Sequence, residues 1–197
     1  MNWPAMLSYI LINSFTPGPN NILSMTNSAK LGFKKAYTYT VGATCTVFFI
    51  SLASGYFTTK LYEYIPYISG VLKWLGAAYM IYLAYYVCVD HPEKPEGEKK
   101  STLAPASFWS GVVMQFINPK LIIGALTTLT TYILPFDQSN KMILFFSILM
   151  ALFAMVFISC WGLFGALFQR VFQKYRKTTS AVMAVLLVYC AVSSFIH

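Results

Sequence analysis

Six long apolar stretches constrain this chain more than any other feature of its sequence. A bilayer core about 30 Å thick is crossed by a helix of about 20 apolar residues, because each residue rises about 1.5 Å. The sequence predicts such spans at 4–28, 35–59, 66–88, 105–134, 141–168 and 178–196. We therefore expect an all-α integral membrane protein with six transmembrane helices.

The composition excludes a soluble enzyme. Hydrophobic residues make up 57% of the chain and charged residues only 10%, whereas soluble proteins carry about 25% charged residues. The net charge of +8 does not indicate nucleic acid, because the basic residues lie in short clusters between the apolar stretches. We expect membrane lipid and a small molecule as partners, and no nucleic acid.

The basic clusters also predict an orientation, because Lys and Arg gather in cytoplasmic loops. Most of them follow the first, third and fifth spans: Lys30, Lys34, Lys35, Lys94, Lys99, Lys100, Arg170, Lys174, Arg176 and Lys177. The loops on the other side hold only Lys60 and Lys141. Both termini are therefore predicted to lie outside the cytoplasm.

The chain divides into two three-helix halves within one transmembrane domain, 1–197. The first half is 1–89 and the second is 105–197, and the polar segment 90–104 is predicted to be a cytoplasmic linker. Because each half has an odd number of spans, the two halves run through the bilayer in opposite directions.

The first span of each half contains a helix-breaking motif near its middle. The first motif is Thr16-Pro17-Gly18-Pro19-Asn20, in which two prolines remove two amide donors. The second is Asn118-Pro119, in which Asn118 is suited to cap a new half-helix that begins at Pro119. We predict that helices 1 and 4 break at mid-membrane. A pair of proline kinks retained for packing is the alternative, but two breaks at matching places favour an inverted-repeat transporter with its site at the midplane.

The predicted breaks offer groups of both signs. The half-helices that begin at Pro19 and Pro119 would present free amides and positive dipole ends, which suit a carboxylate. The carbonyls of Asn13, Phe15 and Gln115 would lose their helical partners and suit an ammonium group. An amino-acid zwitterion carries both charges.

Lys120 lies one residue inside the second half-helix. A full charge at the centre of a membrane helix costs about 2.5–3.5 kcal/mol. The lysine either pairs with backbone carbonyls, or serves as a counter-charge for a carboxylate or as a protonation switch. Polar or small residues follow each break at helical spacing, and they outline a possible permeation path. The alternative is that they serve helix–helix packing. They are Asn20, Ser24 and Asn27 after the first break, and Lys120, Gly124, Thr127 and Thr131 after the second.

Other chemistry has little support in the sequence. All six acidic residues lie in loops or at span ends, and the only histidines are His91 and His197, so we expect no metal site, no cofactor and no catalytic residue. The cysteines, Cys45, Cys88, Cys160 and Cys190, have no CxxC spacing, and we expect them to be buried thiols. Two alternatives remain, a membrane thiol oxidoreductase and a cation exporter.

The two proline motifs and Lys120 resemble the paired signatures of the lysine exporter/homoserine-threonine exporter (LysE/RhtB) family. Segments 76–79, 107–109, 168–170 and 186–192 are similar to members that export cysteine and O-acetylserine. The resemblance implies efflux of amino acids across the bacterial inner membrane, with the proline motifs forming the translocation site, and proton exchange as a driving force.

We accordingly expect a secondary transporter that exports small neutral amino acids or derivatives by alternating access, with cysteine or O-acetylserine favoured. Facilitated efflux without protons fits the missing intramembrane acid equally well, and a homodimer is expected from the small size. The expected substrate-binding residues surround the two breaks: Asn13, Phe15, Thr16, Pro17, Gly18, Pro19, Asn20, Gln115, Asn118, Pro119 and Lys120.

Overall fold

The computed structural model of the chain describes residues 2–88 and 106–196. Every regular element among these residues is helical. The predicted linker, 90–104, lies outside the described residues.

Each of the six predicted spans corresponds to one or more helices. The first half contains α1 (Trp3–Phe15), α2 (Pro19–Leu31), α3 (Phe33–Tyr56) and α4 (Thr58–Cys88). The second contains α5 (Phe108–Phe116), α6 (Pro119–Thr127), the π-helix η1 (Thr128–Ile133), α7 (Asn140–Leu167), the short α8 (Gln169–Lys174) and α9 (Arg176–Ile196).

Both predicted helix breaks are present. α1 ends at Phe15 and α2 begins at Pro19, with Thr16 and Gly18 in extended conformation between them. The second break lies between Phe116 and Pro119, and the helices on its two sides are bent by 65°. Proline is well suited to the first position of a helix, because the amide that it lacks has no helical partner there.

Two of the described helices, α3 and α7, are long and apolar enough to cross a membrane. The bent pair formed by 108–116 and 119–133 makes a third candidate span when it is counted as one. α4 and α9 contain shorter apolar segments, Trp74–Cys88 and Lys177–Ser193. By length and composition these helices are candidate membrane spans, whereas the six-crossing inverted repeat remains a prediction.

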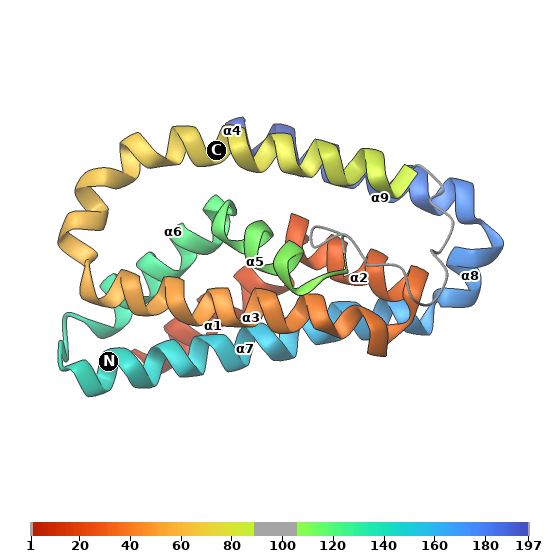
Figure 1. Cartoon of the computed structure of the whole chain (residues 1–197). Helices are drawn as coiled ribbons and strands as arrows, with labels where there is room; N and C mark the ends of the chain where they lie inside the picture. Colours follow the sequence, from red (N-terminus) through yellow and green to blue (C-terminus); the bar gives the residue numbers. More distant parts are fainter. Residues whose placement is uncertain (1, 89–105, 197) are drawn as a thin grey trace.

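Corresponding helices of the two halves pack against each other. α3 lies along α7, and α4 lies along α9 at one edge of the molecule (Figure 1). In Figure 1 the N-terminus, the α3–α4 turn and the η1–α7 loop share one end, which we call the N-terminal end, and α8 and the α2–α3 turn lie at the other, the α8 end. The two apolar clusters include Leu23, Leu83 and Leu187 in one, and Met6, Leu129 and Phe146 in the other.

Two glycines allow unusually close packing of helix backbones. A Cβ atom placed on Gly165 of α7 would lie 2.1 Å from the carbonyl oxygen of Met25 in α2. One placed on Gly111 of α5 would lie 2.2 Å from the carbonyl oxygen of Tyr39 in α3. Since no side chain fits at these distances, glycine is required at both crossings, and α2 and α5 are held tightly against the other half of the molecule.

Candidate functional site

The fold brings the two helix breaks into contact. The Lys120 ammonium, in the first turn of α6, donates a 3.2 Å hydrogen bond to the carbonyl oxygen of Thr16 in the first break. A Cβ atom on Gly18 would lie 3.6 Å from Nζ of Lys120. Residues far apart in the sequence therefore lie side by side, and the missing side chain of Gly18 leaves room beside the Lys120 ammonium.

A second contact joins α1 and α6 one turn further along. A Cβ atom on Gly124 would lie only 2.7 Å from Nδ2 of Asn13. Glycine at this position thus lets the amide of Asn13 lie directly on the α6 backbone. The predicted site residues Asn13, Gly18 and Lys120 are brought together by these contacts.

Asn21, which the sequence analysis did not select, holds the first break together. Its Nδ2 donates to the carbonyl oxygens of Ser14 at 2.9 Å and Thr16 at 3.3 Å. These carbonyls lie at the broken end of α1, where helical donors run out. An asparagine two residues after a Pro-Gly-Pro motif is the sequence signal that could have identified this residue.

The carbonyls of Asn13 and Phe15 precede by four residues the two prolines, Pro17 and Pro19, which have no amide to donate to them. None of the described residues donates a hydrogen bond to either of them. The ring of Phe15 is exposed and packs edge-on against Phe157, with centroids 5.0 Å apart, so only the backbone of this residue belongs to the site. The side chain of Thr16 likewise turns away, because its hydroxyl donates to the carbonyl of Ile12 at 2.6 Å.

Asn20 is buried just inside α2 and is oriented by a tyrosine that the sequence analysis did not select. The hydroxyl of Tyr39, on α3, donates to Oδ1 of Asn20 at 2.6 Å, and Tyr39 is fully buried. Because the side-chain oxygen is engaged, Nδ2 is the group of Asn20 that remains suited to donate to a carboxylate.

At the second break, two predictions about individual groups are wrong. The carbonyl of Gln115 is not left without a partner, because the amide of Asn118 donates to it at 3.3 Å. Asn118 occupies the N-cap position of α6, but its side chain does not cap the helix. It donates instead to Oε1 of Gln115 at 3.2 Å. The tight turn at 116–118 closes the break with its own backbone, which proline spacing alone did not reveal.

Lys120 supplies a full positive charge at the joined breaks. An ammonium has three donors, and one of them is used on Thr16. The backbone pairing considered for this lysine is therefore present, yet it leaves donors for a carboxylate. The N-termini of α2 and α6 add the positive ends of two helix dipoles at the breaks.

The predicted polar paths fare differently. On α2, Ser24 donates to the carbonyl of Ile158 at 2.9 Å, and residues 20–29 are all buried, so this path is closed by α7. On the other path, Gly124 and Thr127 precede the π-helix η1, whose wider turn changes the phase of the helix. Thr131 is consequently exposed, and Thr130 lines a pocket instead.

The four cysteines are all free. The expectation that they are buried is wrong for Cys88 and Cys160, which are exposed, while Cys45 and Cys190 are partly buried. Among the described residues, no group of three or more His, Cys, Asp or Glu side chains is placed to hold a metal ion.

Comparison with known proteins gives a consistent result. Residues 11–197 match the sequence profile of the family described as "LysE type translocator". Relatives named "Cysteine/O-acetylserine efflux protein" from Escherichia coli (strain K12) and Shigella sonnei (strain Ss046) are each 35% identical over 191 residues, which cover 97% of this chain and 96% of the relative. No solved structure matches the chain significantly. The relatives are efflux proteins and not enzymes.

Proposed function

Since this chain belongs to the LysE family of translocators, we propose that it exports a small neutral amino acid from the cytoplasm, with cysteine or O-acetylserine as the favoured substrate. The membership makes it a membrane transporter and not an enzyme, which removes the thiol oxidoreductase alternative. The observation that carries the proposal is the contact between the breaks, the hydrogen bond from Lys120 to the Thr16 carbonyl.

In the proposed complex, the joined breaks bind the two charged ends of the amino acid. The ammonium of Lys120, the first-turn amides of α2 and the backbone amide of Lys120 in α6 hold the carboxylate, and Nδ2 of Asn20 orients it. The amide of Leu121 is not available, because it donates to the carbonyl of Asn118 at 3.1 Å. The carbonyls of Asn13 and Phe15 receive the ammonium group of the substrate. Asn118 and Gln115 shape the second break through their mutual hydrogen bond. Pro17, Pro19 and Pro119 keep the backbone groups free by preventing a continuous helix.

Transport would follow by alternating access between two inverted repeats, 1–89 and 105–197. The pairing of α3 with α7 and of α4 with α9 supports a repeat, because each pair joins corresponding helices of the two halves. The burial of α2 closes the α8 end. Under the predicted orientation, that is the cytoplasmic side, and the protein lies in the bacterial inner membrane with both termini outside.

Proton exchange and facilitated efflux make different predictions about a pH gradient. Export from loaded vesicles that accelerates when a proton gradient is imposed supports exchange, and an unchanged rate supports facilitated efflux. A homodimer is proposed as the assembly and is tested by the mass of the purified protein in detergent.

The proposed role of Lys120 is tested by Lys120→Met. Export of O-acetylserine from loaded vesicles should fall at least about tenfold, because a hydrogen bond to a charged group contributes about 1.5–3 kcal/mol. The amount of protein in the membrane should stay the same. Lys177→Met is the matched control, since Lys177 is an exposed residue at the start of α9. Export at the wild-type rate by Lys120→Met would contradict the proposed site.

A further inference from the structure

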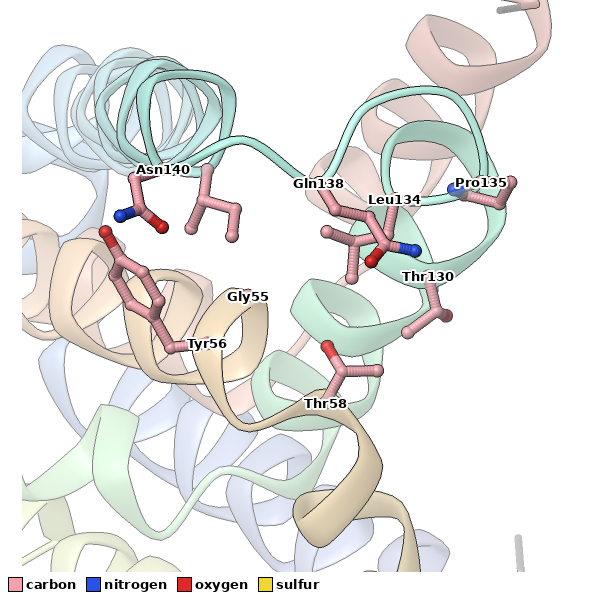
Figure 2. Close-up of a pocket in the computed structure, with 9 residues that line it drawn as sticks. Gly55, Tyr56, Thr58, Thr130, Leu134, Pro135, Gln138 and Asn140 are labelled. Atoms are coloured by element: carbon pink, nitrogen blue, oxygen red, sulfur yellow. The ribbon is translucent and has the colours of Figure 1, made fainter.

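A polar pocket lies at the N-terminal end of the molecule, between the α3–α4 turn, η1 and the start of α7 (Figure 2). Its volume is about 420 Å³, which is within the range of small-molecule sites. None of its described lining residues is charged, and none belongs to the helix breaks. We call it the exit pocket and define it by Tyr56, Thr58, Thr130, Gln138 and Asn140.

One wall of the exit pocket carries hydrogen-bond donors. Gln138 and Asn140 contribute side-chain amides, and both flank the N-terminus of α7. Ser139 caps this helix by accepting from the amide of Met142 at 3.3 Å, and the positive end of the helix dipole lies beside the pocket. Uncharged amide donors at the start of a 28-residue helix suit a carboxylate, and they bind it more weakly than a full positive charge does.

The other walls carry hydroxyl oxygens whose protons are already used. Thr130 donates to the carbonyl of Leu126 at 2.8 Å, and Thr58 donates to the carbonyl of Ser54. Their remaining lone pairs are acceptors, which suit an ammonium group. Figure 2 shows Tyr56 extending toward Asn140 and Thr58 lying below Gln138. The pocket therefore pairs donors and acceptors, as the zwitterion of an amino acid requires.

A polar stripe on α3 leads toward this pocket from the middle of the molecule. The hydroxyls of Thr44, Ser51 and Ser54 are buried and have no hydrogen-bond partner among the described residues. Their spacing places them along one side of the helix, and Ser54 is followed by Gly55, which lines the pocket. Buried hydroxyls without partners are costly unless water or a ligand satisfies them. These hydroxyls lie on the helix whose last residues line the exit pocket, and water or substrate passing along α3 would satisfy them.

From these observations we propose that the exit pocket is a second amino-acid site, which binds the zwitterion after it leaves the helix breaks. The proposal rests on the export function and adds a site to it. Binding there is weaker than at the breaks, because amides and hydroxyls replace the full charge of Lys120. A weak neutral site at the N-terminal end, which is the outer side under the predicted orientation, releases substrate readily.

The test uses a single cysteine as a reporter of occupancy. Gln138→Cys is made in a chain whose native Cys45, Cys88, Cys160 and Cys190 are replaced by Ala, and is labelled with a membrane-impermeant maleimide. O-Acetylserine is the probe, because it has no thiol to consume the reagent. At a concentration about ten times its dissociation constant it should slow labelling about tenfold, by mass action. The methyl ester of O-acetylserine, with its carboxylate masked, should give no protection.

Two comparisons separate the exit pocket from the breaks. Phe136→Cys lies in the same loop but does not line the pocket, so its labelling should be unaffected by the probe. Protection of Gln138→Cys should persist when Lys120→Met is added. Leu134→Cys, at a lining residue that carries no proposed donor, repeats the measurement with both side-chain amides in place. Absence of protection at both reporters, or its loss with Lys120→Met, would overturn the exit pocket. Failure of the wild-type chain to export any amino acid would instead overturn the proposed function.

Discussion

The two halves of the first broken span differ sharply in burial. α1 and α2 each contain 13 residues, and α1 is the more apolar of the two. Nevertheless α1 buries only Met6 and Ile10, whereas α2 buries every residue from 20 to 29, including three asparagines. In a bilayer, apolar side chains face lipid and polar side chains are enclosed by protein. The comparison teaches that the polar half-helix, and not the apolar one, forms the interior of this protein.

The same contrast separates the two ends of the molecule. At the α8 end, α2 is sealed against α7 by the crossing at Gly165 and by the hydrogen bond of Ser24. At the N-terminal end, the structure contains the exit pocket. This arrangement is what a transporter closed on one side would show. The first three of the following experiments test the packing of α2 and its contrast with α1, and the last tests the loop at the N-terminal end.

The largest effect is expected from filling the crossing between α2 and α7. Gly165→Leu should eliminate folded protein, because a Cβ alone would lie 2.1 Å from the Met25 carbonyl oxygen and the cost exceeds about 3 kcal/mol. Gly70→Leu on α4 is the control, since a Cβ there meets nothing within 4 Å. The yield of monodisperse protein after detergent extraction measures both. Equal yields would show that α2 is not packed tightly.

The second largest effect is expected from one of two matched leucine substitutions, one on each half-helix. Leu23 of α2 is 0% exposed and Leu11 of α1 is 43% exposed. Leu23→Ala should destabilise the protein by about 2–5 kcal/mol, because the cavity it leaves is enclosed. Leu11→Ala should have a much smaller effect. Thermal unfolding in detergent compares the two variants, and equal losses would remove the contrast between α1 and α2.

A smaller loss of stability is expected from removing the hydrogen bonds that join α2 to the C-terminal end of α1. Asn21→Ala leaves the carbonyls of Ser14 and Thr16 without the amide that now reaches both, at a cost of about 1–3 kcal/mol. Ser24→Ala removes one hydrogen bond to Ile158 and should cost about 0.5–1.5 kcal/mol. The unfolding temperature of the Asn21→Ala variant should therefore be lower than that of the Ser24→Ala variant. The reverse order would mean that Asn21 does not hold the break.

The smallest effect concerns the exposed loop at the N-terminal end. The amide of Ser139 donates to Oδ1 of Asp137 at 2.7 Å, and this hydrogen bond lowers the pKa of Asp137 from 3.8. The stabilisation is therefore present above the ordinary pKa and disappears as the pH falls through the lowered value. At neutral pH the Asp137→Asn variant should unfold at a slightly lower temperature than the wild type, and this difference in unfolding temperature should vanish in acid. A difference that grows in acid would contradict this contact.

Particular residues show why only part of the site was predictable. The breaks were predicted from covalent chemistry, since Pro17, Pro19 and Pro119 lack the amide that a helix interior uses. The side chains that hydrogen-bond to the residues of the first break cannot be predicted from proline positions. Asn21 and Tyr39 act through contacts that depend on how α2 meets α1 and α3. The carbonyl of Gln115 was wrongly expected to be free because the local turn supplies the Asn118 amide.

The order of the residues by itself determined the helical class, the positions of both breaks and the charge placed beside them, because these depend on apolar length and on missing amides. Which groups face one another was decided by the tertiary structure. It set Lys120 on the Thr16 carbonyl, sealed the polar α2 against α7, and rotated Thr130 into the exit pocket through the wider turn of η1. The physical reason is that glycine crossings and side-chain hydrogen bonds join helices distant in the chain, and their geometry is not encoded in local spacing.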